Sequence, residues 1–310
     1  MISFVIPVLN EEEGLLAFYQ ELSKEQKKLG DSYETLFIDD GSIDGSLAIL
    51  KDLLKKDKNV RLFSFRRNRG KSEALSLGFQ KAKGDYVVTL DADLQDRPSE
   101  VHKLLDEVRG NWDVVSGWRK NRQDKKKMVW ASKLFNLLVK TFWGLSLHDY
   151  NCGLKAYTSD AAKSLRLYGG FHRFIPLIAF QEGFTVTEVV VEHDKRRFGK
   201  SKYGFSKVWK DLPDIFSMIF LAKYSKRPLH FFGFIGLFLM VIGVVILLYL
   251  LGVQLHGQSI GRRPLLMYGI LSILAGVQIF LTGFLGDLII NSSSREMFHQ
   301  PLRFSSDKTL

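Results

Sequence analysis

Cysteine is nearly absent from this sequence of 310 residues, which contains only Cys152. A single cysteine excludes an intramolecular disulfide and fits a reducing compartment. The N-terminus lacks both a basic segment and a small-residue cleavage site. We therefore expect its short apolar run, residues 2–8, to belong to the fold rather than to a signal peptide.

Acidic residues are outnumbered by basic ones. Lys and Arg total 44 against 33 Asp and Glu, which gives a formal net charge of +11 at pH 7. An excess of this size predicts an anionic partner: a nucleic acid, a phosphate-bearing substrate or an anionic membrane surface. The charged residues lie mostly before Arg227, and the hydrophobic C-terminal third favours a membrane over a nucleic acid.

Charged residues are missing from two long runs, residues 229–252 and 264–286. Each run exceeds the roughly 20 apolar residues that cross a bilayer. The short polar connection between them predicts a transmembrane hairpin whose second helix extends to about residue 288. A buried hairpin of a soluble protein is the less favoured interpretation at this length.

Basic residues beside these runs bear on their orientation. Lys223, Lys226 and Arg227 precede the first run and, by the positive-inside rule, place the N-terminal domain in the cytoplasm. Arg262 and Arg263, between the runs, weaken that assignment.

Two further segments, residues 128–147 and 207–224, combine aromatic residues with lysines. This composition is typical of amphipathic helices that lie in the plane of a membrane interface. Ordinary helices covering a sheet are the alternative. Neither interpretation is favoured for residues 128–147. The membrane interface is favoured for residues 207–224, because this segment runs directly into the hydrophobic region.

The N-terminal half alternates short apolar strands with helices. This alternation predicts an α/β domain with a Rossmann-like, mostly parallel sheet, in which ligands bind beyond the carboxyl ends of the strands. Strands are expected at residues 2–8, 35–38, 60–65, 86–90 and 113–116, and helices at residues 11–29, 44–57, 71–82 and 98–109.

The expected strand 86–90 is followed by Asp91, Ala92 and Asp93. Two carboxylates spaced in this way at a strand end can bind one hard cation, Mg²⁺ or Mn²⁺, together with substrate phosphates. Gln95 adds an amide oxygen. A solvated turn is the alternative, because Asp is common in turns.

Two other polar loops follow the first two strands. Asp40 can accept a hydrogen bond from a nucleotide base, and Glu11 one from a ribose hydroxyl. For Asp44 and Ser46 we favour a helix-capping role.

The ordered blocks VIPVLNEE, FIDDGSIDGS, RNRGKSEAL and GDYVVTLDADLQD resemble family 2 glycosyltransferases with a GT-A fold. With the two spans, the chain resembles the polyprenyl-phosphate glycosyltransferases, which include dolichol-phosphate mannose synthase and bacterial undecaprenyl-phosphate glucosyltransferases. The resemblance implies a Mg²⁺ or Mn²⁺ cofactor at Asp91, Asp93 and Gln95. It places the nucleotide sugar at Pro7, Leu9, Asn10, Glu11, Ile38, Asp39, Asp40, Lys71, Asp91 and Ala92.

The resemblance also gives roles to basic residues and to one further carboxylate. Arg119, Arg197, Ser201 and Lys202 would bind phosphate and acceptor. Asp93, Arg119 and Asp149 would be the catalytic residues. Asp149 is either a base or an orienting group, and a phosphate acceptor is already an anionic nucleophile at neutral pH.

The expected reaction is an inverting transfer of one hexose from a nucleotide sugar to a polyprenyl phosphate. UDP-glucose is the favoured donor, and GDP-mannose and a modified arabinose donor are the alternatives. Processive synthases usually carry a Gln-x-x-Arg-Trp motif, which is absent. A non-catalytic scaffold and a flippase are further alternatives.

The expected protein is a homo-oligomer of the bacterial inner membrane. It would comprise a cytoplasmic GT-A domain, a juxtamembrane helix, the transmembrane hairpin and a flexible tail, at residues 1–206, 207–227, 228–290 and 291–310.

Overall fold

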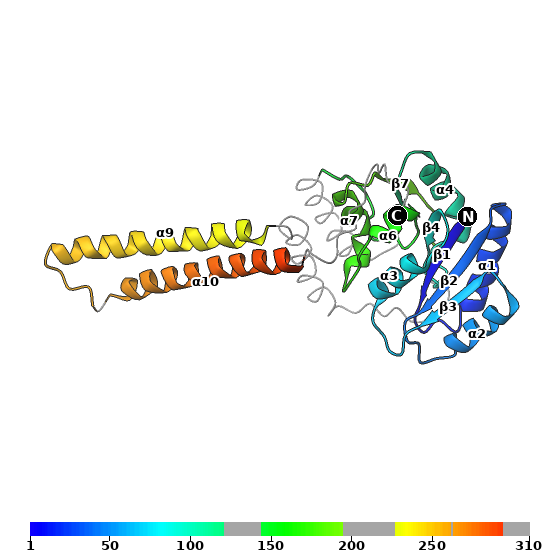
Figure 1. Ribbon diagram of the computed structural model, residues 1–310, viewed down its shortest axis with the longest axis horizontal. Helices are drawn as coiled ribbons and strands as arrows, with labels where there is room; N and C mark the ends of the chain where they lie inside the picture. The colour runs from blue at the N-terminus through cyan, green and yellow to red at the C-terminus, as the bar shows by residue number, and fades with distance from the viewer. Residues whose placement is uncertain (121–143, 195–226, 262, 294–310) are drawn as a thin grey trace. The chain divides into compact units, whose positions relative to one another are not determined.

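The computed structural model describes residues 1–120, 144–194, 227–261 and 263–293 (Figure 1). The chain divides near residue 214 into an α/β unit and a C-terminal helical unit, and each is described by itself. The predicted interface helices fall outside the described residues, except for residues 144–147, which are irregular.

The first half of the α/β unit confirms the predicted alternation of strands and helices. Element boundaries differ from the prediction by a few residues. In chain order the elements are β1 (Ile2–Val8), α1 (Leu15–Lys28), β2 (Tyr33–Asp39), α2 (Ser46–Lys56), β3 (Val60–Ser64), α3 (Lys71–Lys81), β4 (Tyr86–Thr89), the 3-10 helix η1 (Pro98–Glu100), α4 (Val101–Gly110) and β5 (Val114–Trp118).

The second half of this unit contains elements that the sequence did not predict. They include two strands that enlarge the sheet. In chain order they are β6 (Lys155–Thr158), α6 (Ser159–Ser164), the 3-10 helix η2 (Phe171–Arg173), α7 (Ile175–Gln181) and β7 (Val186–Val190).

The seven strands form one sheet in the order β3-β2-β1-β4-β6-β5-β7. Strands β1 to β4 are parallel, whereas β6 runs antiparallel to both β4 and β5. Because the chain continues from β1 to β2 on one side and reaches β4 on the other, the strand order reverses between β1 and β4. Such a reversal opens a crevice beyond the carboxyl ends of the two strands.

Helices cover both faces of this sheet, which explains why β1 is apolar nearly throughout. Phe4 and Ile6 belong to the same buried cluster as Phe18 of α1 and Leu104 of α4. On the other face Val5 lies against α3, where a β-carbon added to Gly78 would sit 2.2 Å from a Val5 methyl group. A strand buried on both faces needs continuous rather than alternating hydrophobicity.

The C-terminal unit is a hairpin of two long helices, α9 (Pro228–Leu255) and α10 (Pro264–Ser293), which lie side by side (Figure 1). Their most apolar windows have mean hydropathies of 3.0 and 2.0, and only 17% and 11% of those windows is buried. Exposed apolar helices of this length fit a bilayer rather than a soluble core. The chain is therefore a membrane protein, with α9 and α10 as its candidate spans.

Candidate active site

The loops that follow β1, β2 and β4 meet at the carboxyl edge of the sheet, as the sequence predicted. Hydrogen bonds join the first two loops directly. The Asn10 amide donates to Ser42 Oγ at 3.0 Å, and the Ile43 amide donates to Asn10 Oδ1 at 2.8 Å. Asn10 has a left-handed backbone with φ of 51°, a conformation that Asn tolerates better than most residues.

Asp39 and Asp40, predicted to bind nucleotide, are buried at the end of β2. Asp39 accepts hydrogen bonds from the Ser42 amide and the Ser64 hydroxyl, at 3.1 and 2.6 Å. Asp40 accepts the amides of Arg69 and Gly70, at 2.7 and 3.0 Å. Both carboxylates thus shape the loops around the crevice and hold the segment that leads into α3.

Lys71, the first residue of α3, reaches across the crevice to the acidic motif. Its Nζ lies 2.5 Å from Asp91 Oδ1, and both side chains are about one-third exposed, at 32% and 33%. Burial opposes ionisation of Asp91, but the charge and hydrogen bond of Lys71 outweigh that effect and lower the pKa of this carboxyl. Asp91 is therefore ionised and partly neutralised at neutral pH.

The acidic loop, defined here as residues 91–97, is tightly constrained. Buried Leu94 has a left-handed backbone with φ of 60°, a conformation that is unfavourable for a branched side chain. A β-carbon on Gly153 would sit 2.7 Å from Asp91 Oδ2 and 2.6 Å from Asp96 Oδ2. Any side chain at Gly153 would therefore displace the two carboxylates.

Asp96 is a buried carboxyl that the sequence analysis passed over. Burial, and then the charges of Asp91 and Asp93, raise its pKa to about 7. Carboxylates crowded in this way repel one another, and a cation beside them relieves the repulsion.

The residues of the acidic loop fit a divalent cation such as Mg²⁺ or Mn²⁺. Their side chains offer oxygen atoms as ligands, which these ions prefer. Among the described residues, no three His, Cys, Asp or Glu side chains form a metal site by themselves. Mg²⁺ commonly takes one or two protein carboxylates and completes its shell with substrate phosphates and water. Asp91 accepts the Lys71 ammonium, and Asp93 accepts the Gln95 amide at 3.2 Å. The oxygens of Asp91, Asp93 and Gln95 are the candidate ligands.

Arg119 and Asp149 form a second ion pair, a buried one, beyond the end of β5. Arg119 Nε and Nη2 donate to the two carboxylate oxygens at 2.7 and 3.0 Å, and the two side chains are 11% and 5% exposed. Burial opposes the positive charge of Arg119, but the hydrogen bonds to Asp149 and the negative charges of Asp149 and Asp96 together outweigh it and raise the guanidinium pKa. Since both oxygens of Asp149 are engaged, the geometry favours an orienting role over that of a base.

A third cation, Lys155 of β6, is almost completely buried. Its ammonium donates to the Cys152 carbonyl, and it lines a small polar cavity with Asp91, Thr89 and His172. Burial lowers the pKa of Lys155 to about 8. No sequence pattern gives this residue a role, because nothing local indicates that β6 inserts beside β4.

Cys152, His148 and His172 make structural contacts near the crevice. Burial raises the pKa of the Cys152 thiol to about 12, so it is protonated and packs as an apolar residue. His148 contacts Glu188 and stacks on Trp118, with ring centroids 3.9 Å apart. His172 Nδ1 lies 3.0 Å from Ser72 Oγ. None of them belongs to a metal cluster among the described residues.

Five other predicted site residues are either buried or outside the described part of the chain. Ile38 and Ala92 are buried, so their side chains are not exposed at the crevice. The phosphate- and acceptor-binding residues Arg197, Ser201 and Lys202 lie outside the described residues.

Two curated proteins resemble this chain over most of its length. The chain is 34% identical over 304 residues to a dodecaprenyl-phosphate galacturonate synthase of Rhizobium johnstonii, a match that covers 95% of this chain and 89% of the relative. It is 32% identical over 291 residues to an undecaprenyl-phosphate 4-deoxy-4-formamido-L-arabinose transferase of Pseudomonas fluorescens, covering 93% and 84% of the two chains.

A solved structure shares the fold. Glucosyl-3-phosphoglycerate synthase of Mycobacterium tuberculosis, crystallised with Mn²⁺, uridine diphosphate and phosphoglyceric acid, aligns with a TM-score of 0.56 at 18% identity, over 72% of this chain and 78% of that one. Residues 3–166 match the family described as glycosyl transferase family 2. This chain belongs to glycosyltransferase family 2, and it is a glycosyltransferase.

Proposed function

We propose that this enzyme transfers a sugar from a nucleotide sugar to a polyprenyl phosphate at the membrane. The observation that carries the proposal is the similarity over more than nine-tenths of the chain, at 34% and 32% identity, to two transferases named for polyprenyl phosphates. The exposed apolar hairpin supports a lipid acceptor. We infer a cytoplasmic active site in a bacterial inner membrane and a homo-oligomeric assembly.

The reaction is a single displacement at the anomeric carbon. An oxygen of the acceptor phosphate forms the new bond, the bond to the nucleoside diphosphate breaks, and the configuration inverts. Arg119, fixed by Asp149, holds the acceptor phosphate, which needs orientation and charge compensation more than deprotonation. A divalent cation bound by Asp93, with Asp91 and Gln95 beside it, would supply charge stabilisation to the departing diphosphate.

The identity of the sugar donor is harder to infer from the sequence. The family resemblance favours glucose, with mannose and a modified arabinose as alternatives. The two relatives are named for galacturonate and 4-deoxy-4-formamido-L-arabinose, which favours a modified or acidic sugar. We propose such a donor, with UDP-glucose and GDP-mannose as the other candidates.

The proposal is tested with membranes that contain the full chain. They are incubated with polyprenyl phosphate, Mn²⁺ or Mg²⁺, and each labelled donor in turn: UDP-galacturonate, UDP-4-deoxy-4-formamido-L-arabinose, UDP-glucose and GDP-mannose. We expect label in the lipid fraction with one donor. Removing one group that stabilises the charge of a transition state typically lowers the rate by about 100-fold or more. We expect a loss of this size from Asp93→Ala.

Two outcomes would contradict the proposal. Nucleotide binding without transfer from any donor would favour a non-catalytic scaffold. Unchanged transfer by Asp93→Ala would remove the metal assignment while leaving the acceptor assignment intact.

A further inference from the structure

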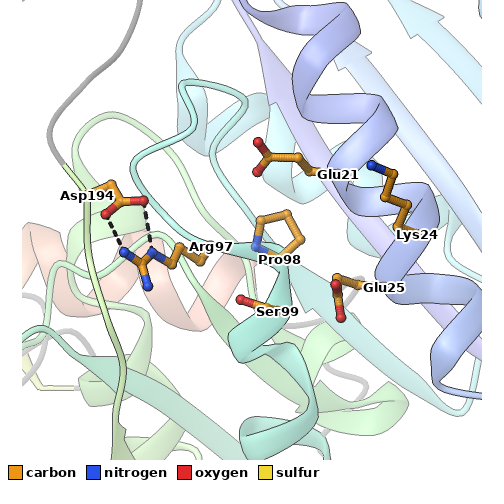
Figure 2. A pocket seen from close by; sticks show the side chains of 7 residues that line it. All are labelled: Glu21, Lys24, Glu25, Arg97, Pro98, Ser99 and Asp194. Atoms are coloured by element: carbon orange, nitrogen blue, oxygen red, sulfur yellow. Dashed lines mark hydrogen bonds and ion pairs between the residues drawn. The ribbon is translucent and has the colours of Figure 1, made fainter.

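The far end of the acidic loop is tied to the segment that follows β7. Arg97 Nε and Nη2 donate to the two oxygens of Asp194 at 2.8 and 2.7 Å, and Nη1 contacts Glu192. Figure 2 shows the two parallel bonds between Arg97 and Asp194. A bidentate pair of this kind fixes the relative orientation of both side chains as well as their distance.

Backbone contacts strengthen the same connection. The Asp194 amide donates to the Gln95 carbonyl at 2.9 Å, and Asp96 forms an isolated antiparallel bridge with His193. The Val191 amide donates to the Trp118 carbonyl at 3.0 Å, one residue before Arg119. Residues 191–194 thus link the acidic loop to the strand end that carries the Arg119–Asp149 pair.

A cavity lies beside the Arg97–Asp194 pair, and both residues line it. Arg97, Pro98 and Ser99 border this cavity of about 250 Å³, whose far wall is formed by Glu21, Lys24 and Glu25 of α1 (Figure 2). Side chains of α1 therefore do not fill the space beside Arg97. Among the described residues, the links to residues 192–194 therefore help to hold this end of the loop in place.

We propose that Arg97 and Asp194 are a positioning pair, which fixes the acidic loop in the geometry that binds the divalent cation and the donor diphosphate. The inference rests on the proposed function, because it assigns the pair a role in binding that cation. Arg97 and Asp194 touch neither substrate nor cation. They act through the acidic loop, because the Asp194 amide donates to the Gln95 carbonyl and the neighbouring His193 is bridged to Asp96.

A purely structural role predicts a different result from a positioning role. Loss of a stabilising ion pair lowers the thermal midpoint and leaves cation affinity unchanged. Loss of a positioning pair weakens cation binding in protein that is still folded.

The test uses the full chain in detergent and measures Mn²⁺ binding from the free-Mn²⁺ electron paramagnetic resonance signal, with the thermal midpoint as a second readout. We expect Arg97→Ala and Asp194→Ala each to weaken Mn²⁺ binding by about fivefold, the upper range for a partly exposed pair. Arg97→Lys, which keeps the charge but not the fork, should lie between Arg97→Ala and the unsubstituted protein. With the donor that is turned over, KM should rise more than kcat falls.

Arg109→Ala is the matched control. Arg109 forms an ion pair of 2.5 Å with Asp31, in which the side chains are 35% and 34% exposed. The Arg109→Ala substitution should leave Mn²⁺ affinity unchanged. Unaltered affinity in Arg97→Ala, with Asp93→Ala defective, overturns the inference alone. Equal affinity in Asp93→Ala and the unsubstituted protein overturns the metal assignment and the inference together.

Discussion

At the scale of single residues, the buried ammonium of Lys155 connects stability to activity. Its pKa is lowered from 10.5 to about 8 because burial disfavours the charge. Between these two values the unfolded chain keeps a proton that the folded protein releases, so stability rises with pH through this window. Below pH 8 the cost of the buried charge, on the order of 3 kcal/mol, is fully present.

Lys155→Met should remove this pH dependence. The variant leaves the Cys152 carbonyl without its donor, which costs about 1–3 kcal/mol, and it also removes the buried charge. We expect similar unfolding free energies at pH 7 and a less stable variant above pH 10, measured by denaturation of the full chain in detergent. Transfer activity should fall, because the variant loses a positive charge beside Asp91. A parallel rise of stability with pH in both proteins would contradict this explanation.

At the scale of elements, close contact between backbones holds the hairpin together. A β-carbon on Gly276 would sit 2.6 Å from the Gly236 carbonyl, and one on Gly236 would sit 2.6 Å from the Gly276 carbonyl. Small residues permit this approach, which favours helix association in lipid. Gly276→Leu should therefore force α9 and α10 apart, at a cost of about 1–3 kcal/mol.

Gly252→Leu provides the matched control for this prediction. A β-carbon on Gly252 in α9 would meet no atom within 4 Å, so the variant gains side-chain volume without a clash. Thermal aggregation in detergent, followed by size exclusion, should begin at a lower temperature for Gly276→Leu only. Equal onset temperatures for the two variants would show that the contact does not limit stability.

The elements also show where sequence reasoning ends. Strands β1 to β5 were predictable because each is a short apolar run with turn residues after it, and their ends predicted where the crevice loops meet. Strand β6 was missed because it has four residues and contains a lysine. Its place between β4 and β5 depends on pairing with residues that are distant in the sequence. Local hydrophobic periodicity does not predict such pairing.

The site divides in the same way. Asp91, Asp93 and Arg119 follow predicted strands, so the sequence alone singles them out as candidates. Asp96 and Lys155 owe their burial to β6 and to the approach of Gly153, so their altered pKa values follow only from the tertiary fold. The Arg97–Asp194 pair joins residues separated by 97 positions, which no spacing rule connects.

At the scale of the whole molecule, the net charge of +11 predicts that the bilayer itself affects the rate. An anionic surface attracts nearby Lys and Arg by about 1 kcal/mol each. Full-length enzyme in nanodiscs of mixed phosphatidylcholine and phosphatidylglycerol should therefore transfer sugar several-fold faster than in phosphatidylcholine alone.

Salt separates this electrostatic effect from other differences between lipids. Raising the ionic strength from 0.15 to 1 M shortens the screening length from about 8 to 3 Å, so the advantage of the anionic nanodiscs should largely disappear. Arg109→Ala, which changes the net charge by one unit away from the site, should keep most of the advantage. A lipid effect that persists at high salt would mean that the headgroup is recognised by its shape and that the excess of basic residues does not set the rate.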